Sequence, residues 1–134
     1  MRKGFTLLEL IIVIIIIGVL ASLGFTQYTR VVERGRTAEA KAILGTIRTA
    51  EQAYYLEQGS YTSTIGNLAV NASTACNGQT AYYFAYSVTG STTDFTGTAT
   101  RCTGTEGKTP GFAGIAYVIN ITQDGTWGGT QGYY

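Results

Sequence analysis

The 134-residue chain contains no histidine, only one proline and few charged residues, and these scarcities exclude several kinds of function. Without histidine the chain lacks the usual general base and the commonest metal ligand, and it cannot form a Ser-His-Asp triad. Lys108 has no Ser-x-x-Lys context. The formal net charge of +1 requires neither a nucleic acid nor a strongly acidic partner. We therefore predict a non-enzymatic protein without a cofactor or a nucleic-acid partner.

Charge is almost absent from the 20 residues between Thr6 and Phe25, where Glu9 is the only charged side chain. A helix of this length, at about 1.5 Å per residue, spans a hydrocarbon core of roughly 30 Å. A cleaved signal peptide would have a shorter apolar core and a small-x-small site at its far end, for which Ala21-Ser22 is a poor candidate. Because Arg2 and Lys3 precede the segment, we expect a cytoplasmic N-terminus and an extracytoplasmic remainder.

The stretch GFTLLEL, preceded by the short basic leader Met1-Arg2-Lys3, resembles the class III signal of type IV pilins and type II secretion pseudopilins. The resemblance covers some ten residues and the apolar run that follows. It implies that prepilin peptidase cleaves between Gly4 and Phe5, so that the apolar segment is retained and Phe5 becomes an N-methylated N-terminus. It also implies assembly through an inner-membrane machinery into a homopolymer on the bacterial surface.

The same resemblance offers a role for Glu9, whose carboxylate costs about 2–3 kcal/mol in a membrane. Cleavage creates an amine at Phe5, one helical turn from Glu9, on the same subunit or on an incoming neighbour. Attraction between the two charges at about 4 Å is worth roughly 4 kcal/mol at an effective dielectric near 20, which offsets the cost of insertion. The alternative is a carboxylate that snorkels to the bilayer edge or stays protonated.

A second helical pattern follows the apolar segment, from Tyr28 to about Gln58. Its apolar residues recur at steps of three and four, which places them on one face, and Gly59-Ser60 ends the pattern. These residues are Ala40, Ile43, Leu44, Ile47, Ala50 and Tyr54. Arg34, Lys41, Arg48 and Glu51 are expected largely elsewhere, in water or against neighbouring subunits. The two segments predict one helix of about 50 residues, in which melting around Gly18–Gly24 on assembly is a further expectation.

Three later runs are rich in β-branched and aromatic residues and predict strands at Ala81–Val88, Asp94–Arg101 and Gly114–Ile121. A short fourth strand is expected at Thr126-Trp127. We expect a hairpin connection at Thr89-Gly90-Ser91 and another turn at Gln123-Asp124-Gly125. The predicted fold class is therefore α+β, with a long N-terminal helix against a three- or four-stranded antiparallel sheet. This layout agrees with the ladle fold that the resemblance implies.

The two cysteines, Cys76 and Cys102, flank the first predicted hairpin. Outside the cytoplasm disulfides persist, so a Cys76–Cys102 bridge is expected, and two reduced buried thiols are the alternative. In many pilins the disulfide reaches close to the C-terminus, whereas some thirty residues follow Cys102 here. We therefore expect sheet pairing to hold the tail.

Other candidate sites are weaker. The acidic residues Asp94, Glu106 and Asp124 are too scattered in the sequence for a calcium loop. A calcium site that these residues form only when the chain folds is the alternative. Asn71-Ala72-Ser73 and Asn120-Ile121-Thr122 match the N-glycosylation sequon, but the second lies in a predicted strand. The tyrosine clusters are expected to serve packing.

Charge is divided along the chain. Residues 30–48 hold five basic and two acidic side chains, and residues 49–134 hold two basic and five acidic ones. This division favours either attraction between stacked copies or a solvated surface of arbitrary sign.

These patterns predict four regions: a leader at 1–4, a membrane-spanning and filament-core helix half at 5–27, an amphipathic half at 28–58, and a globular head at 59–134. The predicted function is a structural subunit of a type IV pilus-like filament. The alternatives are a type II secretion pseudopilin or minor pilin and, in another class, a monomeric membrane-anchored binding domain outside the cytoplasm.

Overall fold

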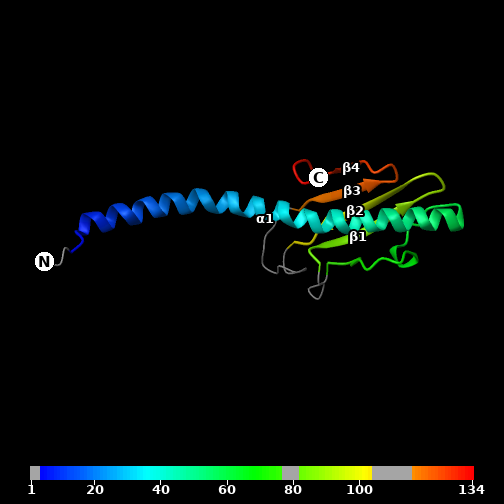
Figure 1. The fold of residues 1–134 in the computed structure, drawn as a ribbon, viewed down its shortest axis with the longest axis horizontal. Helices are drawn as coiled ribbons and strands as arrows, with labels where there is room; N and C mark the ends of the chain where they lie inside the picture. Colours follow the sequence, from blue (N-terminus) through cyan, green and yellow to red (C-terminus); the bar gives the residue numbers. More distant parts are fainter. Residues whose placement is uncertain (1–3, 77–81, 104–115) are drawn as a thin grey trace. The chain divides into compact units, whose positions relative to one another are not determined.

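The computed structural model describes residues 4–76, 82–103 and 116–134, except for the side chain of Thr26. These residues form two compact units, Met1–Gly35 and Arg36–Tyr134. A long helix, α1 (Leu7–Gln58), is followed by a short 3₁₀ turn, η1 (Ile65–Asn67) (Figure 1). The strands are β1 (Phe84–Gly90), β2 (Phe95–Arg101), β3 (Val118–Thr122) and β4 (Trp127–Gly129).

The predicted helix of about 50 residues is confirmed, because α1 contains 52. It ends as expected at Gln58, where Gly59 adopts a positive φ of 74° and its N–H donates to the carbonyl of Tyr55 at 2.8 Å. This left-handed conformation at the position after a helix favours glycine, which has no Cβ to clash. Residues Gly18–Gly24 are helical here. Melting of that stretch in a filament stays a prediction.

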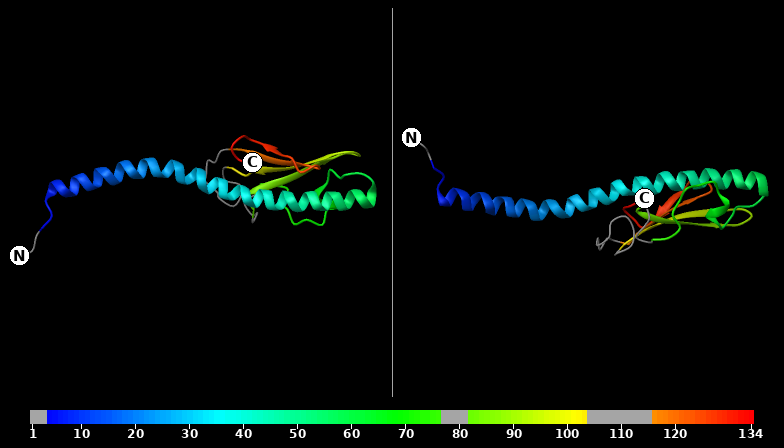
Figure 2. Two further views of the ribbon diagram at one scale, coloured as in Figure 1. Left: turned by 45° about the horizontal axis from the view of Figure 1, so that its top comes forward. Right: turned by 90° about the horizontal axis from the view of Figure 1, so that it is seen from below.

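The four strands form one antiparallel sheet in the order β1-β2-β3-β4, so each strand pairs with its neighbour in the sequence (Figure 2). Phe84 pairs with Arg101 across β1 and β2, and Thr98 pairs with Asn120 across β2 and β3. The α+β class and the antiparallel sheet are thereby confirmed. The strand at Ala81–Val88 begins later than predicted, at Phe84, and Ala81 itself lies outside the described residues. Likewise the first residues of the predicted Gly114–Ile121 strand lie outside them.

The prediction of a hairpin connection at Thr89-Gly90-Ser91 is wrong. Strand β1 continues to Gly90, which pairs with Phe95, and the chain turns at Ser91–Asp94. The N–H of Ser91 donates to the carbonyl of Asp94 at 2.8 Å, which closes this turn. A Cβ on Gly90 would lie 2.4 Å from the carbonyl oxygen of Thr62. Glycine at this position therefore permits the close approach of another chain segment rather than a turn.

The core lies between the sheet and residues of α1 beyond Gly35 (Figure 2). Helix residues Ala40, Leu44 and Ile47 are fully buried, which confirms the predicted apolar face. Their partners alternate along the strands, as expected when one face of a sheet is covered. These strand residues are Phe84, Tyr86, Val88, Ala99, Ile119 and Ile121. At Gly97 the missing side chain allows Leu44 and Ile47 to approach the sheet.

Glu51 contradicts the expectation that it would lie in water or against neighbouring subunits, because it is completely buried. It follows Ile47 by four residues and Leu44 by seven, so the helical period places it on the buried face. Its Oε2 accepts the backbone N–H of Thr62 at 3.0 Å, while its buried Oε1 has no partner among the described residues. Burial raises the pKa of the Glu51 carboxyl, although the hydrogen bond from Thr62 acts in the opposite direction.

Arg48 also contacts the head of its own chain, since its Nε donates to the carbonyl of Gln123 at 3.1 Å. This contact joins α1 to the predicted turn at Gln123-Asp124-Gly125. The turn is confirmed by a hydrogen bond of 3.0 Å from the N–H of Gly125 to the carbonyl of Thr122.

The other face of the sheet carries short uncharged side chains. On β1, β2 and β3 the residues that alternate with the core are mostly serine, threonine and asparagine. They are Ser87, Thr89, Thr96, Thr98, Thr100, Asn120 and Thr122, and we call this set the hydroxyl face. They are exposed or partly exposed.

The C-terminal tail is held by sheet pairing, as predicted. Ile121 pairs with Trp127 across β3 and β4. Beyond β4, the N–H of Thr130 donates to the carbonyl of Val118 at 2.9 Å. The ring of Tyr133 stacks on that of Tyr117, with their centroids 4.0 Å apart. The tail therefore stays attached without a disulfide of its own.

Candidate assembly site at the start of the chain

Gly4, Phe5 and Thr6 precede α1 and are exposed, with 92% of the surface of Phe5 accessible. The proposed cleavage point, between Gly4 and Phe5, therefore lies just outside the helix. Glu9 is in the first turn of α1. One helical turn thus separates the residue that would carry the new amine from the carboxylate.

A reciprocal capping arrangement links Thr6 and Glu9. Oε2 of Glu9 accepts hydrogen bonds from the backbone N–H and from the hydroxyl of Thr6, both at 2.9 Å. In return the backbone N–H of Glu9 donates to Oγ1 of Thr6 at 3.2 Å. This is the capping box, in which a threonine and a glutamate three residues later satisfy free N–H groups of the first helical turn. The sequence analysis missed it, although the spacing Thr-Leu-Leu-Glu is its signature.

The capping box occupies only part of the Glu9 carboxylate. Among the described residues, no hydrogen bond or ion pair reaches Oε1. This oxygen can accept a further donor without breaking the contacts to Thr6. Glu9 therefore caps the N-terminus of α1 through Oε2 and presents Oε1 as a free acceptor at the same end of the helix.

From Leu7 to Phe25 every residue of α1 is exposed. Within the described part of the chain, α1 is the one helix long and apolar enough to cross a membrane, judged by length and composition. Such a surface is unfavourable in water, at about 25 cal/mol for each Å² of apolar area. Leu7–Phe25 therefore requires an apolar environment, from a lipid bilayer or from other protein.

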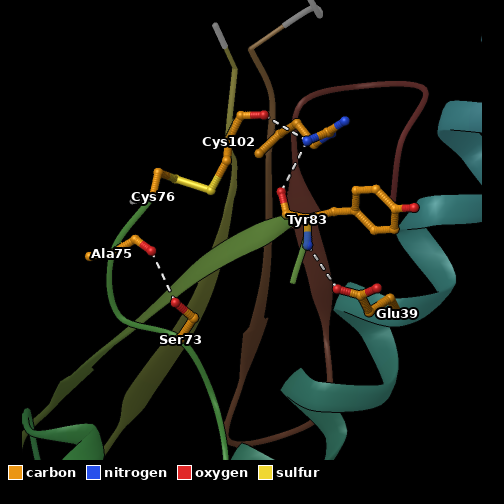
Figure 3. Close-up of a disulfide and its surroundings, with 7 residues drawn as sticks. Glu39, Ser73, Ala75, Cys76, Tyr83 and Cys102 are labelled. Carbon is orange, nitrogen blue, oxygen red and sulfur yellow. Dashed lines mark hydrogen bonds between the residues drawn. A yellow bond between two sulfur atoms is a disulfide. The ribbon is translucent and has the colours of Figure 1, made fainter. Parts of the chain in front are cut away.

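A disulfide joins Cys76 to Cys102 with a Cα–Cα distance of 5.4 Å, as predicted from their placement around the hairpin (Figure 3). The backbone beside it is tied to Tyr83, the residue before β1, and through Tyr83 to α1. Nη1 of the buried Arg101 donates to the carbonyl oxygens of Cys102 and Tyr83, at 2.6 and 3.1 Å. The N–H of Tyr83 donates to Oε1 of Glu39 at 3.0 Å. This network connects the disulfide to the helix.

The chain was compared with models of known families and with characterised proteins. Residues 37–128 match the family described as type IV pilin-like G and H, which is more than half of the chain. The chain belongs to the type IV pilin family. Residues 1–25 of this pilin also match the prokaryotic N-terminal methylation motif. Members of this family are structural proteins, and this pilin is a structural subunit of a pilus.

Among its relatives, the fimbrial protein EcpC of Eikenella corrodens is 33% identical over 118 residues, which are 86% of this pilin and 76% of the relative. The type IV major pilin protein PilA of Myxococcus xanthus is 37% identical over 60 residues, covering 45% and 27% of the two chains. PilE of Neisseria gonorrhoeae, also a type IV major pilin protein, is 33% identical over 79 residues, covering 59% and 47%. The pilin thus spans most of EcpC but less than half of PilA and PilE.

The acidic candidates Asp94 and Asp124 each accept hydrogen bonds from hydroxyl groups close to them in sequence. The side chain of Asp94 accepts hydrogen bonds from Ser91 and Thr93, and that of Asp124 from Thr122 and Thr126. The bond from Thr122, with those from Thr126, lowers the pKa of Asp124. Glu106 lies outside the described residues, among which no three metal-ligating side chains gather. The sequon residue Asn120 lies inside β3, as expected.

Proposed function

We propose that copies of this pilin assemble into a type IV pilus-like extracellular filament through their apolar helices, with Glu9 of one copy bound to the Phe5 amine of a neighbour. The observation that carries the proposal is the exposed apolar helix Leu7–Phe25, in which every residue is accessible and a single carboxylate lies in the first turn. Copies packed side by side remove the apolar surface from water. Each contact joins two different surfaces of neighbouring copies and does not close into a ring. Further copies can therefore be added, and the filament grows with helical symmetry.

The leader, residues 1–4, is removed by a prepilin peptidase, and Phe5 is then N-methylated. The match of residues 1–25 to the N-terminal methylation motif supports both steps. The exposed position of Gly4 and Phe5 before the helix supports access by the enzyme.

The new amine at Phe5 and the carboxylate of Glu9 attract each other strongly once both leave water. At about 4 Å and an effective dielectric near 20, the attraction is roughly 4 kcal/mol. The capping contacts to Thr6 hold Oε2 and leave Oε1 for the amine of the neighbour. Pairing between copies therefore fixes how far one helix is displaced along the next.

Before assembly, the segment 5–27 anchors the subunit in the inner membrane, with the head outside the cytoplasm. The disulfide Cys76–Cys102 supports this location, because such bonds persist in oxidising compartments. Assembly by the inner-membrane machinery then transfers the subunit to the surface filament.

The proposal is tested by replacing Glu9 with alanine and examining sheared surface material by electron microscopy. We expect Glu9→Ala to leave the processed subunit in the membrane and to abolish filaments, because the amine of each neighbour loses its partner. Glu57→Ala, which removes an exposed carboxylate from the other end of the same helix, is the matched control and should give normal filaments.

Mass spectrometry of the mature N-terminus completes the test. A methylated Phe5 is expected in wild-type filaments, and a Gly4 variant that resists cleavage should remain in the membrane. Normal filaments from Glu9→Ala or from the uncleaved chain would contradict the proposal. A dispersed protein that still begins at Met1 would instead indicate a monomeric membrane-anchored domain.

A second function within the family, that of a minor pilin or type II secretion pseudopilin, is compatible with the match to the pilin-like G and H model. Abundance separates the two functions. A main filament subunit dominates the sheared fraction, whereas a minor component is scarce in it. The identity to the major pilins PilA and PilE favours the first.

A further inference from the structure

Strand β1 lies at one edge of the sheet, so only one side of its backbone pairs with β2. The hydrogen bond of 2.8 Å from the N–H of Ser91 to the carbonyl of Asp94 fixes which residues face β2, because backbone groups alternate in direction along an antiparallel strand. Odd-numbered residues of β1 direct their N–H and C=O groups to β2. The even-numbered residues Tyr86, Val88 and Gly90 therefore direct theirs to the outer edge.

The segment between α1 and β1 runs back along this outer edge and pairs with it at two places (Figure 1). At one place the carbonyl of Ser73 accepts the N–H of Tyr86 at 2.7 Å. At the other, Oγ of Ser63 accepts the N–H of Gly90 at 2.9 Å and donates to its carbonyl at 3.1 Å. Val88 lies between the two, and no described residue bonds to its outward N–H and C=O. Because buried backbone groups without partners cost free energy, Val88 requires an acceptor and a donor from elsewhere.

A cleft of about 270 Å³ lies at this unpaired position, and we call it the edge cleft. Residues 86–88 of β1 line one side, and residues 63–66 and Thr74 line the rest. Its volume is below the range of about 300–1,000 Å³ that is typical of pockets for drug-sized ligands. The edge is also unpaired over one residue only, which is too short for an added β-strand. The edge cleft therefore suits a compact ligand of about the size of one sugar ring.

The lining of the edge cleft is uncharged and rich in hydroxyl groups. The hydroxyls of Thr64, Thr74 and Ser87 bond to no described residue, so each can donate to a ligand or accept from it. Ile65 and Val88 add apolar surface. A neutral sugar has the matching chemistry, with hydroxyls that both donate and accept and with apolar C–H groups on its ring. A charged ligand would lose hydration without gaining a counter-ion from the lining.

We propose that the edge cleft binds one residue of a neutral carbohydrate through the backbone of Val88 and the hydroxyls of Thr64 and Thr74. One sugar hydroxyl accepts the N–H of Val88 and another donates to its carbonyl, so the ligand takes the place of a neighbouring strand. Ser87 belongs to both the edge cleft and the hydroxyl face, so a longer carbohydrate chain can continue over the sheet. All of these groups belong to one chain, and binding does not depend on the proposed filament.

Binding is tested by saturation-transfer nuclear magnetic resonance on the full-length pilin in a detergent without a sugar head group. The probes are methyl glucoside, methyl galactoside and N-acetylglucosamine, with the blocked peptide N-acetylalanine methylamide as a mimic of an extended chain. We expect at least one of the sugars to bind and the peptide not to bind. Absence of binding by all three sugars, or binding by the peptide alone, would overturn the carbohydrate site.

Gly66, which lines the edge cleft, offers a matched pair of variants. The nearest atom to a Cβ placed on it is the Thr64 methyl carbon, at an ordinary contact distance of 3.9 Å. Gly66→Ala therefore fits and leaves most of the cleft open, whereas Gly66→Leu fills it. We expect Gly66→Ala to keep the wild-type affinity and Gly66→Leu to bind the sugar at least tenfold more weakly. Wild-type affinity in Gly66→Leu would overturn the site.

Thr74→Val keeps the test valid if Gly66→Leu misfolds, because it replaces an exposed hydroxyl by a methyl group of similar size. We expect it to weaken sugar binding by about threefold to tenfold, which is the loss of one neutral hydrogen bond. The matched control is Thr89→Val, which removes an exposed hydroxyl of β1 outside the cleft and should bind as the wild type does. An equal loss from both variants would place the sugar on the hydroxyl face and overturn the edge cleft.

Discussion

Leu20 and Leu44 are the same residue type in the same helix, but Leu20 keeps 64% of its surface exposed and Leu44 keeps none. Around Leu44 the sheet covers one face of α1, and the other face carries small or polar residues. Around Leu20 every position is exposed, including the apolar ones. The difference shows that the unit Arg36–Tyr134, which is called the head from here on, buries its apolar core within one chain. The exposed segment Leu7–Phe25 depends on a membrane or on other copies.

The largest effect is expected from a direct comparison of these two leucines. Leu44→Ala should lower the free energy of unfolding of the head by about 2–5 kcal/mol, because it leaves a cavity among fully buried residues. Leu20→Ala should change that free energy by less than about 0.5 kcal/mol. Denaturant titration of both full-length variants in detergent measures the effects. A similar loss from both variants would show that the two regions share one folding unit.

The disulfide lies wholly within the head, so its removal should destabilise the head and leave the apolar segment Leu7–Phe25 unchanged. The two cysteines are 26 residues apart in the sequence. For a loop of this length, Cys76→Ser combined with Cys102→Ser should lower the free energy of unfolding of the head by about 3 kcal/mol. Helicity of the apolar segment should be unaffected. Thermal melts followed by near-ultraviolet circular dichroism report on the head, and the reduced wild type is the control. An unchanged melting temperature would contradict the stabilising role assigned to the bridge.

Glu51 is expected to give the smallest effect, and one that depends on pH. Burial raises its pKa in the folded state, so protonated Glu51 favours folding. This contribution is complete below the pKa of the unfolded chain and is lost as the pH rises through the folded pKa. Glu51→Gln should therefore stabilise the head at pH 8, by on the order of 1 kcal/mol, and give no gain at pH 4.

Denaturation at the two pH values measures this effect. The exposed Glu57→Gln is the matched control and should show no such difference. Equal effects of Glu51→Gln at pH 4 and pH 8 would contradict the role assigned to burial.

Much of this molecule follows from local patterns in its sequence. Helical periodicity located Leu44 and Ile47 in the core, and the flanking positions of Cys76 and Cys102 indicated their pairing. The same periodicity also places Glu51 on the buried face, but its acidic side chain led to the opposite expectation. Its stabilising contact is with the backbone of Thr62, in a loop that no pattern positions.

Other features depend on contacts distant in sequence. Gly90 was interpreted as a turn residue because its role, the close approach of Thr62, comes from a segment 28 residues earlier. Ala69 and Val70 line one shallow pocket together with residues of α1, and strand and helix patterns do not specify that this later segment lies beside the helix. By contrast, the capping box of Thr6 and Glu9 is local and could have been read directly.

The hydroxyl face has a consequence for how the pilin meets its surroundings. Serine, threonine and asparagine do not ionise in the physiological range, so the side chains of this face bear no charge, although Thr122 at its border donates to the Asp124 carboxylate. Water is held there by hydrogen bonds rather than by ionic hydration. Contacts made by this face, with solvent or with any material it touches, should consequently change little between fresh and saline water or between acid and neutral conditions.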